Sequence, residues 1–130
     1  MNDEERRQKG MSMRRAVLGE TYVDRSVAGR SAFNEAFQDL ITRYAWGEIW
    51  TRPGLPRTTR SLVTLAMLVA QGPGEEFRLH VKAALRNGVT CEEIEEVLLQ
   101  AAIYCGVPAA NSAFHLAEEA FAELPEGETP

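Results

Sequence analysis

Apolar residues recur at helical spacing along most of this chain, and that periodicity limits its fold more than any other feature. Three stripes show the spacing: Phe33, Ala36, Phe37, Leu40, Ile41 and Tyr44; Ile94, Val97, Leu98, Ala101, Ala102 and Cys105; and Ala110, Ala113, Phe114, Ala117, Phe121 and Leu124. No stretch shows the alternation that is typical of a strand. The pattern therefore predicts an all-α fold of six or seven helices joined by short loops.

Capping residues mark the expected ends of several helices. Thr90 and Glu93 form a capping-box pattern before the second stripe, and Pro108 suits the first turn of the third. Asn87 followed by Gly88 predicts a helix C-cap with the glycine in the left-handed conformation. The segment from about 59 to 71 is apolar nearly all round, which predicts a helix buried on several sides, at the centre of the fold, at a subunit interface, or both.

The length of 130 residues predicts one domain covering the whole chain. Residues 1–10 are charged and are expected to extend a loosely held first helix, and residues 125–130 form a predicted frayed tail. A domain of this size buries only about two thirds of its unfolded surface. Oligomerisation through the spare apolar helix faces would add to that burial and is therefore expected.

Charge and hydropathy argue against several classes of partner. The formal net charge of −5 opposes nucleic-acid binding, which needs a basic surface. The longest apolar run, residues 62–70, is too short to span a bilayer, and the N-terminus lacks the apolar core of a signal peptide. The two cysteines form no CxxC motif and no zinc-ligand spacing. We therefore expect a reduced, cytoplasmic protein with no membrane, nucleic-acid or metal partner.

His80 is the first candidate for chemistry. Its spacing from Phe77 and Ala84 places it on the inward face of its helix, and Glu76 lies one turn earlier, within reach of a hydrogen bond. A histidine backed by a carboxylate is a typical proton carrier near neutral pH. The spacing is equally consistent with a buried histidine that Glu76 merely satisfies. His115, by contrast, has only polar helical neighbours and is expected on a solvated face.

A basic, aromatic connection between about residues 45 and 57 is the second candidate. It holds Trp46, Trp50, Arg52 and Arg57, and Arg60 follows one turn later. Arginine binds carboxylates through a bidentate fork, so this cluster could hold a dicarboxylate at the start of a helix. The arginines could instead pair with local acids, and the tryptophans could simply fill the core.

Four stretches of the chain together resemble the carboxymuconolactone decarboxylase family, within the alkylhydroperoxidase D-like superfamily. They are LGETYVD, YAWGEIWTRPGL, TTRSLVTLAML and FRLHVKAALRNGVTCEEIEEVLLQAAIYCGVPAANSAF, at residues 18–24, 44–55, 58–68 and 77–114. The redox members of the superfamily carry CxxCxxxH, whose histidine matches His80. The cysteine positions of that motif fall on Pro73 and Glu76, so this chain lacks the dithiol. A carboxylate that the redox members carry on the preceding helix falls at Ser61.

The resemblance implies a compact alkylhydroperoxidase D-like fold, assembled as a homohexamer or a homotrimer. It also implies cofactor-free decarboxylation of a carboxylated lactone, 4-carboxymuconolactone, to the β-ketoadipate enol-lactone in protocatechuate breakdown. In that reaction we expect His80, oriented by Glu76, to deliver the proton, and the three arginines to hold carboxylate. The site walls are then expected to be Trp46, Trp50 and Tyr104.

Three alternatives remain at the level of sequence. The first is a redox enzyme of the same fold that uses Cys105, although a thiol on an apolar stripe is usually inert packing. The second is a non-catalytic helical oligomer that binds a small ligand or a partner. The third is action on a related lactone, because motifs fix a fold better than a substrate.

Overall fold

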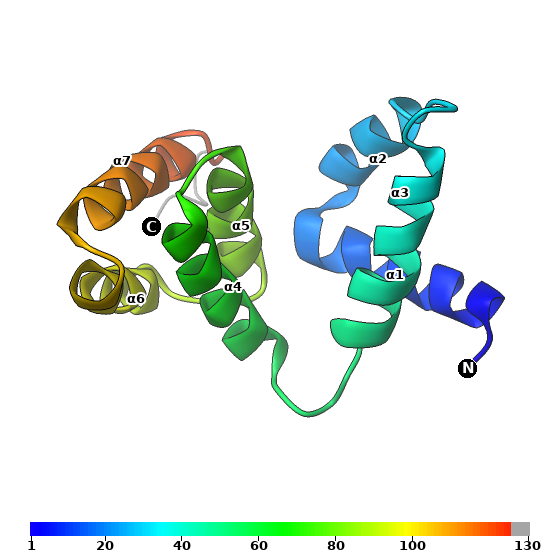
Figure 1. Cartoon of the computed structure of the whole chain (residues 1–130), viewed down its shortest axis with the longest axis horizontal. Helices are drawn as coiled ribbons and strands as arrows, with labels where there is room; N and C mark the ends of the chain where they lie inside the picture. The colour runs from blue at the N-terminus through cyan, green and yellow to red at the C-terminus, as the bar shows by residue number, and fades with distance from the viewer. Residues whose placement is uncertain (126–130) are drawn as a thin grey trace. The chain divides into compact units, whose positions relative to one another are not determined.

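The computed structural model describes residues 1–125, and all regular structure in that range is helical, so the predicted all-α class is confirmed. The chain divides into two compact units at Pro56. The N-terminal unit contains α1 (Asp3–Leu18), α2 (Glu20–Ala28), α3 (Glu35–Leu40) and the π-helix η1 (Ile41–Ile49), and the C-terminal unit contains α4 (Arg57–Gln71), α5 (Glu75–Arg86), α6 (Cys91–Tyr104) and α7 (Val107–Ala122) (Figure 1). None of the helices in residues 1–125 is long and apolar enough to cross a membrane.

In the N-terminal unit, α1 packs on η1 through two glycines. A Cβ atom on Gly10 would overlap the backbone carbonyl of Thr42, and one on Gly47 would overlap the carbonyl oxygen of Arg6. Only glycine allows two helix backbones to approach so closely. The glycines therefore set the distance between α1 and η1.

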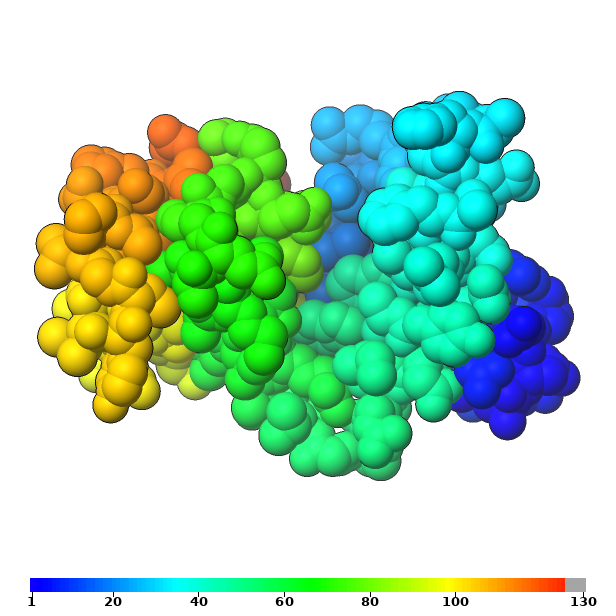
Figure 2. Space-filling view, viewed as in Figure 1, coloured from blue at the N-terminus to red at the C-terminus, as the bar shows by residue number. Residues whose placement is uncertain are grey.

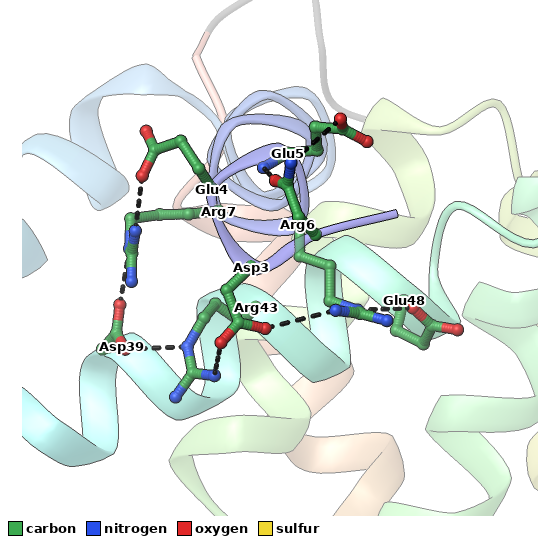
Figure 3. Close-up of polar contacts among 9 residues, drawn as sticks. Asp3, Glu4, Glu5, Arg6, Arg7, Asp39, Arg43 and Glu48 are labelled. Atoms are coloured by element: carbon green, nitrogen blue, oxygen red, sulfur yellow. Dashed lines mark hydrogen bonds and ion pairs between the residues drawn. The ribbon is translucent and has the colours of Figure 1, made fainter.

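Ion pairs on both sides of this crossing hold the start of α1 in place (Figure 3). Arg6 Nε donates to Glu48 at 3.0 Å, and Arg7 Nε donates to Asp39 at 2.8 Å. Residues 1–10 extend the first helix as expected, since α1 begins at Asp3, and Arg6 and Arg7 have ion-pair partners on η1 and α3. Of the predicted frayed tail, residues 126–130 lie outside the described residues.

The connection expected between residues 45 and 57 is partly helical. The N–H of Trp50 bonds to the carbonyl of Ala45 at 3.0 Å, a π-type bond. The hydroxyls of Thr42 and Thr51 donate to the carbonyls of Gln38 and Gly47. The connection without regular helix is therefore confined to residues 50–56.

The apolar stripe predicted at residues 33–44 is helical from Glu35 onward, but much of it is exposed in this chain. Phe33 is 95% exposed and Phe37 is 59% exposed, and Leu40 and Tyr44 are also exposed. Periodicity thus identified the helix correctly, although it could not show whether the same chain covers the apolar face.

The C-terminal unit carries a continuous core, and α4 contacts each of α5, α6 and α7. The buried residues of this core include Leu65, Val69, Phe77, Val81, Ile94, Leu98, Ala113 and Ala117. The predicted capping box is confirmed, since Thr90 Oγ1 accepts from the N–H of Glu93 and Glu93 Oε1 from the N–H of Thr90. Gly88 has the predicted positive φ of 95°.

Candidate functional site

His80 lies on the inward face of α5, as predicted, with only 9% of its surface exposed. Burial penalises the charged imidazolium, which lowers the pKa of His80 from 6.5 to about 4. The side chain is therefore neutral at pH 7 in the free chain. Within residues 1–125, its Nδ1 is buried and makes no hydrogen bond. An unpaired, neutral, buried imidazole is a costly arrangement for a purely structural residue.

The expected hydrogen bond between Glu76 and His80 is absent. Glu76 Oε2 lies 3.9 Å from His80 Nε2, beyond hydrogen-bond distance, and the Glu76 side chain is 69% exposed. Solvent screens a carboxylate in that position, so it does not offset the effect of burial on the histidine. Glu76 is thus a solvent-facing neighbour of the imidazole and does not fix its orientation.

The low pKa of His80 predicts a loss of stability in mild acid. The unfolded chain binds the proton near pH 6.5 and the folded chain only near pH 4, so the stability is fully present above 6.5 and falls as the pH drops toward 4. The loss from this group is about 2 kcal/mol between pH 7 and pH 5. Urea unfolding of the wild type and of His80→Gln at both pH values checks this. An equal loss in the two proteins would contradict it, since His80→Gln has no such group.

The arginines predicted to bind carboxylate lie at the start of α4. Arg57 is exposed and Arg60 is partly buried. Next to them the buried Ser61 accepts a hydrogen bond from Asn87 Nδ2 at 2.9 Å, which places the beginning of α4 beside the end of α5. His80 is seven residues before Asn87, about 10 Å along the helix axis. The histidine and the arginines therefore lie on one packed pair of helices, about two turns apart.

The two tryptophans and Arg52 belong to the N-terminal unit. The rings of Trp46 and Trp50 are stacked, with centroids 5.2 Å apart and planes at 27°. Trp46 is buried and Trp50 is partly buried, whereas Arg52 is exposed in the 50–56 connection. The tryptophan pair thus fills core space and also presents part of one ring outward.

Tyr104 is 83% exposed and lines a groove of about 300 Å³ between α4 and α6. The other lining residues are mostly apolar: Leu62, Val63, Ala66, Val97, Gln100, Ala101 and Cys105. Figure 2 shows α4 in green and the junction of α6 and α7 in yellow to orange at the surface of this unit. His80 is not among the lining residues, so the structure does not bring Tyr104 and His80 together within this groove.

Besides His80, the reactive side chains of the chain include two cysteines and a second histidine. Cys91 and Cys105 are both free thiols, and burial raises the pKa of Cys91, which reduces its thiolate fraction. His115 is exposed, as predicted. In the part of the chain that the structure describes, no group of three or more His, Cys, Asp or Glu side chains could hold a metal ion.

Asn87 is the residue near the candidate site that sequence reasoning missed. Its position before Gly88 identified a helix C-cap, and that role alone explained it. A signal was present in Ser61, a small polar residue within an otherwise apolar helical stretch. Buried polar side chains are nearly always hydrogen-bonded, so Ser61 required a partner that the sequence could not name.

Residues 35–119 match the model of the carboxymuconolactone decarboxylase family. The chain is 52% identical over 124 residues to 4-carboxymuconolactone decarboxylase of Acinetobacter baylyi, covering 95% of this chain and 92% of that protein. It is 40% identical over 126 residues to nitrosuccinic acid decarboxylase of Metarhizium robertsii, covering 95% and 88%. A Pseudomonas putida sequence, also a 4-carboxymuconolactone decarboxylase, is 46% identical over 48 residues, which is 37% of this chain and all of that sequence.

Proposed function

This chain belongs to the carboxymuconolactone decarboxylase family, and we propose that it converts 4-carboxymuconolactone to the β-ketoadipate enol-lactone and CO2. The observation that carries the proposal is similarity along nearly the whole chain to a protein of that activity. The buried, neutral His80 supports it, because the reaction needs one proton at carbon and a site that excludes water.

The substrate supplies its own electron sink. As the bond to the departing carboxylate breaks, its electron pair forms a new double bond in the lactone ring. The electrons of the existing double bond move onto the lactone carbonyl oxygen. A proton then adds to the carbon α to that carbonyl, which restores the carbonyl and gives the enol-lactone. The protein must hold the carboxylates, stabilise the oxyanion and deliver this proton.

His80 is the proposed proton donor. With a pKa of about 4, about one imidazole in a thousand is protonated at pH 7 in the free chain. A substrate carboxylate about 4 Å away stabilises the imidazolium by about 4 kcal/mol at an effective dielectric constant of about 20. That is enough to return the pKa to near neutrality. The dianionic substrate itself therefore charges the acid that later protonates it.

Arg57 and Arg60, with Arg52, are the proposed carboxylate ligands. The first turn of α4 adds free backbone N–H groups and the positive end of the helix dipole to the two arginines that it carries. This local positive charge opposes the net charge of −5, which would otherwise repel a dianion. Trp46, Trp50 and Tyr104 are proposed to wall the complete site and exclude water.

The fungal relative suggests a second candidate substrate, nitrosuccinate. Loss of CO2 from the carbon that bears the nitro group leaves an electron pair that the nitro oxygens accept. In both reactions the substrate itself accepts the electron pair, since nitrosuccinate and the lactone are both dicarboxylates with an electron-accepting group that ends in oxygen. The lactone remains the first candidate because the bacterial relative is more similar over the same share of the chain.

We also propose that the protein is cytoplasmic and assembles as a homohexamer or a homotrimer. Apolar side chains on the outer surfaces of α4, α6 and α7 support it, among them Met67, Leu99, Ile103 and Val107, all of which are exposed in the single chain. Large apolar side chains that are exposed in a single chain are often buried at a subunit interface.

The decisive experiment follows CO2 release from 4-carboxymuconolactone, and separately from nitrosuccinate, by the purified, chelator-treated protein. We expect rapid release from the lactone and no loss of rate after chelation. Light scattering on the same sample is expected to give the mass of a hexamer or trimer. Absence of release from a folded, oligomeric sample would refute the lactone assignment, and preferential release from nitrosuccinate would replace it with the second candidate.

A further inference from the structure

We propose that Asn87 is a positioning residue that sets the register between α4 and α5, and thereby the placement of Arg57 and Arg60 relative to His80. The inference deepens the proposed function and rests on it for its kinetic consequences. Its structural basis is the partly buried hydrogen bond between Asn87 and Ser61.

The backbone around Asn87 is held by a Schellman motif. The N–H of Val89 bonds to the carbonyl of Ala84 at 2.9 Å, and the N–H of Gly88 bonds to the carbonyl of Leu85 at 3.1 Å. The left-handed φ of Gly88 closes this motif. The side chain of Asn87 therefore leaves a fixed point at the end of α5 and does not sample a frayed helix terminus.

The partner, Ser61, is fixed as well. It is 1% exposed and lies on the buried face of α4 with Leu65 and Val69. Apolar contacts along that face are non-directional and would allow small sliding movements of one helix past the other. A hydrogen bond is directional, and breaking it would remove the Asn87 partner of the buried Ser61 hydroxyl. Since the Ser61 hydroxyl is buried and Asn87 Nδ2 donates to it, the bond favours the one register of α4 on α5 in which the two side chains meet.

The same bond also fixes which way His80 points. His80, Ala84 and Asn87 are spaced i, i+4 and i+7, so they share one face of α5. On α4, Arg57 and Arg60 precede Ser61 within the first turns. Anchoring Asn87 to Ser61 therefore fixes the proton donor and the carboxylate ligands relative to each other. A misplacement of about 1 Å between such groups costs about 100-fold in rate.

A double-mutant cycle of Asn87→Ala and Ser61→Ala tests the proposal. We expect each single variant to lower kcat/KM for the lactone about tenfold, and the double variant to lose about the same amount, because both changes break one bond. Additive losses, about 100-fold in the double variant, would overturn the inference. So would a wild-type kcat/KM for Asn87→Ala.

A matched control separates positioning from general destabilisation. Thr90→Ala removes the capping box of α6 and leaves the Asn87–Ser61 bond intact. We expect it to lower the melting temperature by a similar amount while kcat/KM stays within about twofold of wild type. If Thr90→Ala lost as much kcat/KM as Asn87→Ala at an equal melting temperature, positioning would be refuted.

Hydrogen exchange gives a readout that does not depend on the reaction. In Asn87→Ala, amides of residues 61–64 in α4 are expected to exchange faster than in the wild type and in Thr90→Ala. Unchanged exchange would overturn the structural half of the inference even if the enzyme were active. Conversely, faster exchange in a protein that releases no CO2 would refute the proposed function and leave the role of Asn87 in the register standing.

Discussion

Replacing His80 with glutamine is expected to lower kcat for the lactone by about 10²–10⁴-fold while KM changes only a few-fold. General acid catalysis of this kind supplies a factor of that size, and the arginines that bind the carboxylates are retained in the variant. Glutamine also keeps a hydrogen-bonding side chain at the position, so the loss reports the missing proton donor more than a packing defect. Steady-state kinetics with CO2 release as the signal provides the measurement.

His115→Gln is the matched control for this substitution. His115 is the other histidine of the chain and is exposed on α7. We expect its replacement to leave kcat and KM at wild-type values. Wild-type turnover in His80→Gln would remove His80 from the mechanism, and an equal loss in both variants would point to a nonspecific effect of the substitution.

Replacing Gly10 with alanine is expected to destabilise the protein by about 3 kcal/mol, although alanine is intrinsically the better helix former by about 1 kcal/mol. The sign follows from the crossing of α1 and η1, where the new methyl group would overlap the backbone carbonyl of Thr42. A backbone atom cannot rotate away as a side chain can, so one helix must shift. That shift would also weaken the ion pairs that Arg6 and Arg7 make with Glu48 and Asp39.

Thermal unfolding monitored by circular dichroism would measure this effect, with Gly54→Ala as the control. A Cβ at Gly54 meets no atom within 4 Å, and Gly54 does not have a positive φ. Its replacement is therefore expected to be neutral or slightly stabilising. A melting temperature for Gly10→Ala at or above that of Gly54→Ala would show that the helices separate without cost.

The parts of the fold that the sequence predicted are those governed by local chemistry. The Thr90–Glu93 capping box and the left-handed Gly88 each depend on a few adjacent residues, and both are present as expected. The burial of His80 followed from spacing alone. The pairing of the first ten residues with Asp39 and Glu48 involves partners distant in sequence, and predicting it requires knowing that α1 lies on η1.

The sequence predicted which residues belong to the candidate site, but it predicted their positions in space only in part. Spacing placed Glu76 one turn from His80. It could not show that the Glu76 carboxylate is exposed to solvent and lies 3.9 Å from His80 Nε2. The π-helical start of the 45–57 connection was equally hidden, since π-type bonds have no sequence signature comparable to a cap. The Asn87–Ser61 bond joins residues 26 positions apart and needed the packed helices to be seen.

The burial of His80 has a consequence for selectivity under the proposed mechanism. The imidazole is uncharged until an anion binds, so the fraction of His80 that is protonated depends on the negative charge of the bound ligand. An analogue esterified at the carboxylate that stays would bring less charge and leave more of the acid unprotonated. Such a compound would bind in the site and still react slowly. The enzyme would then select its substrate mainly through protonation of His80 on binding, and only secondarily through affinity.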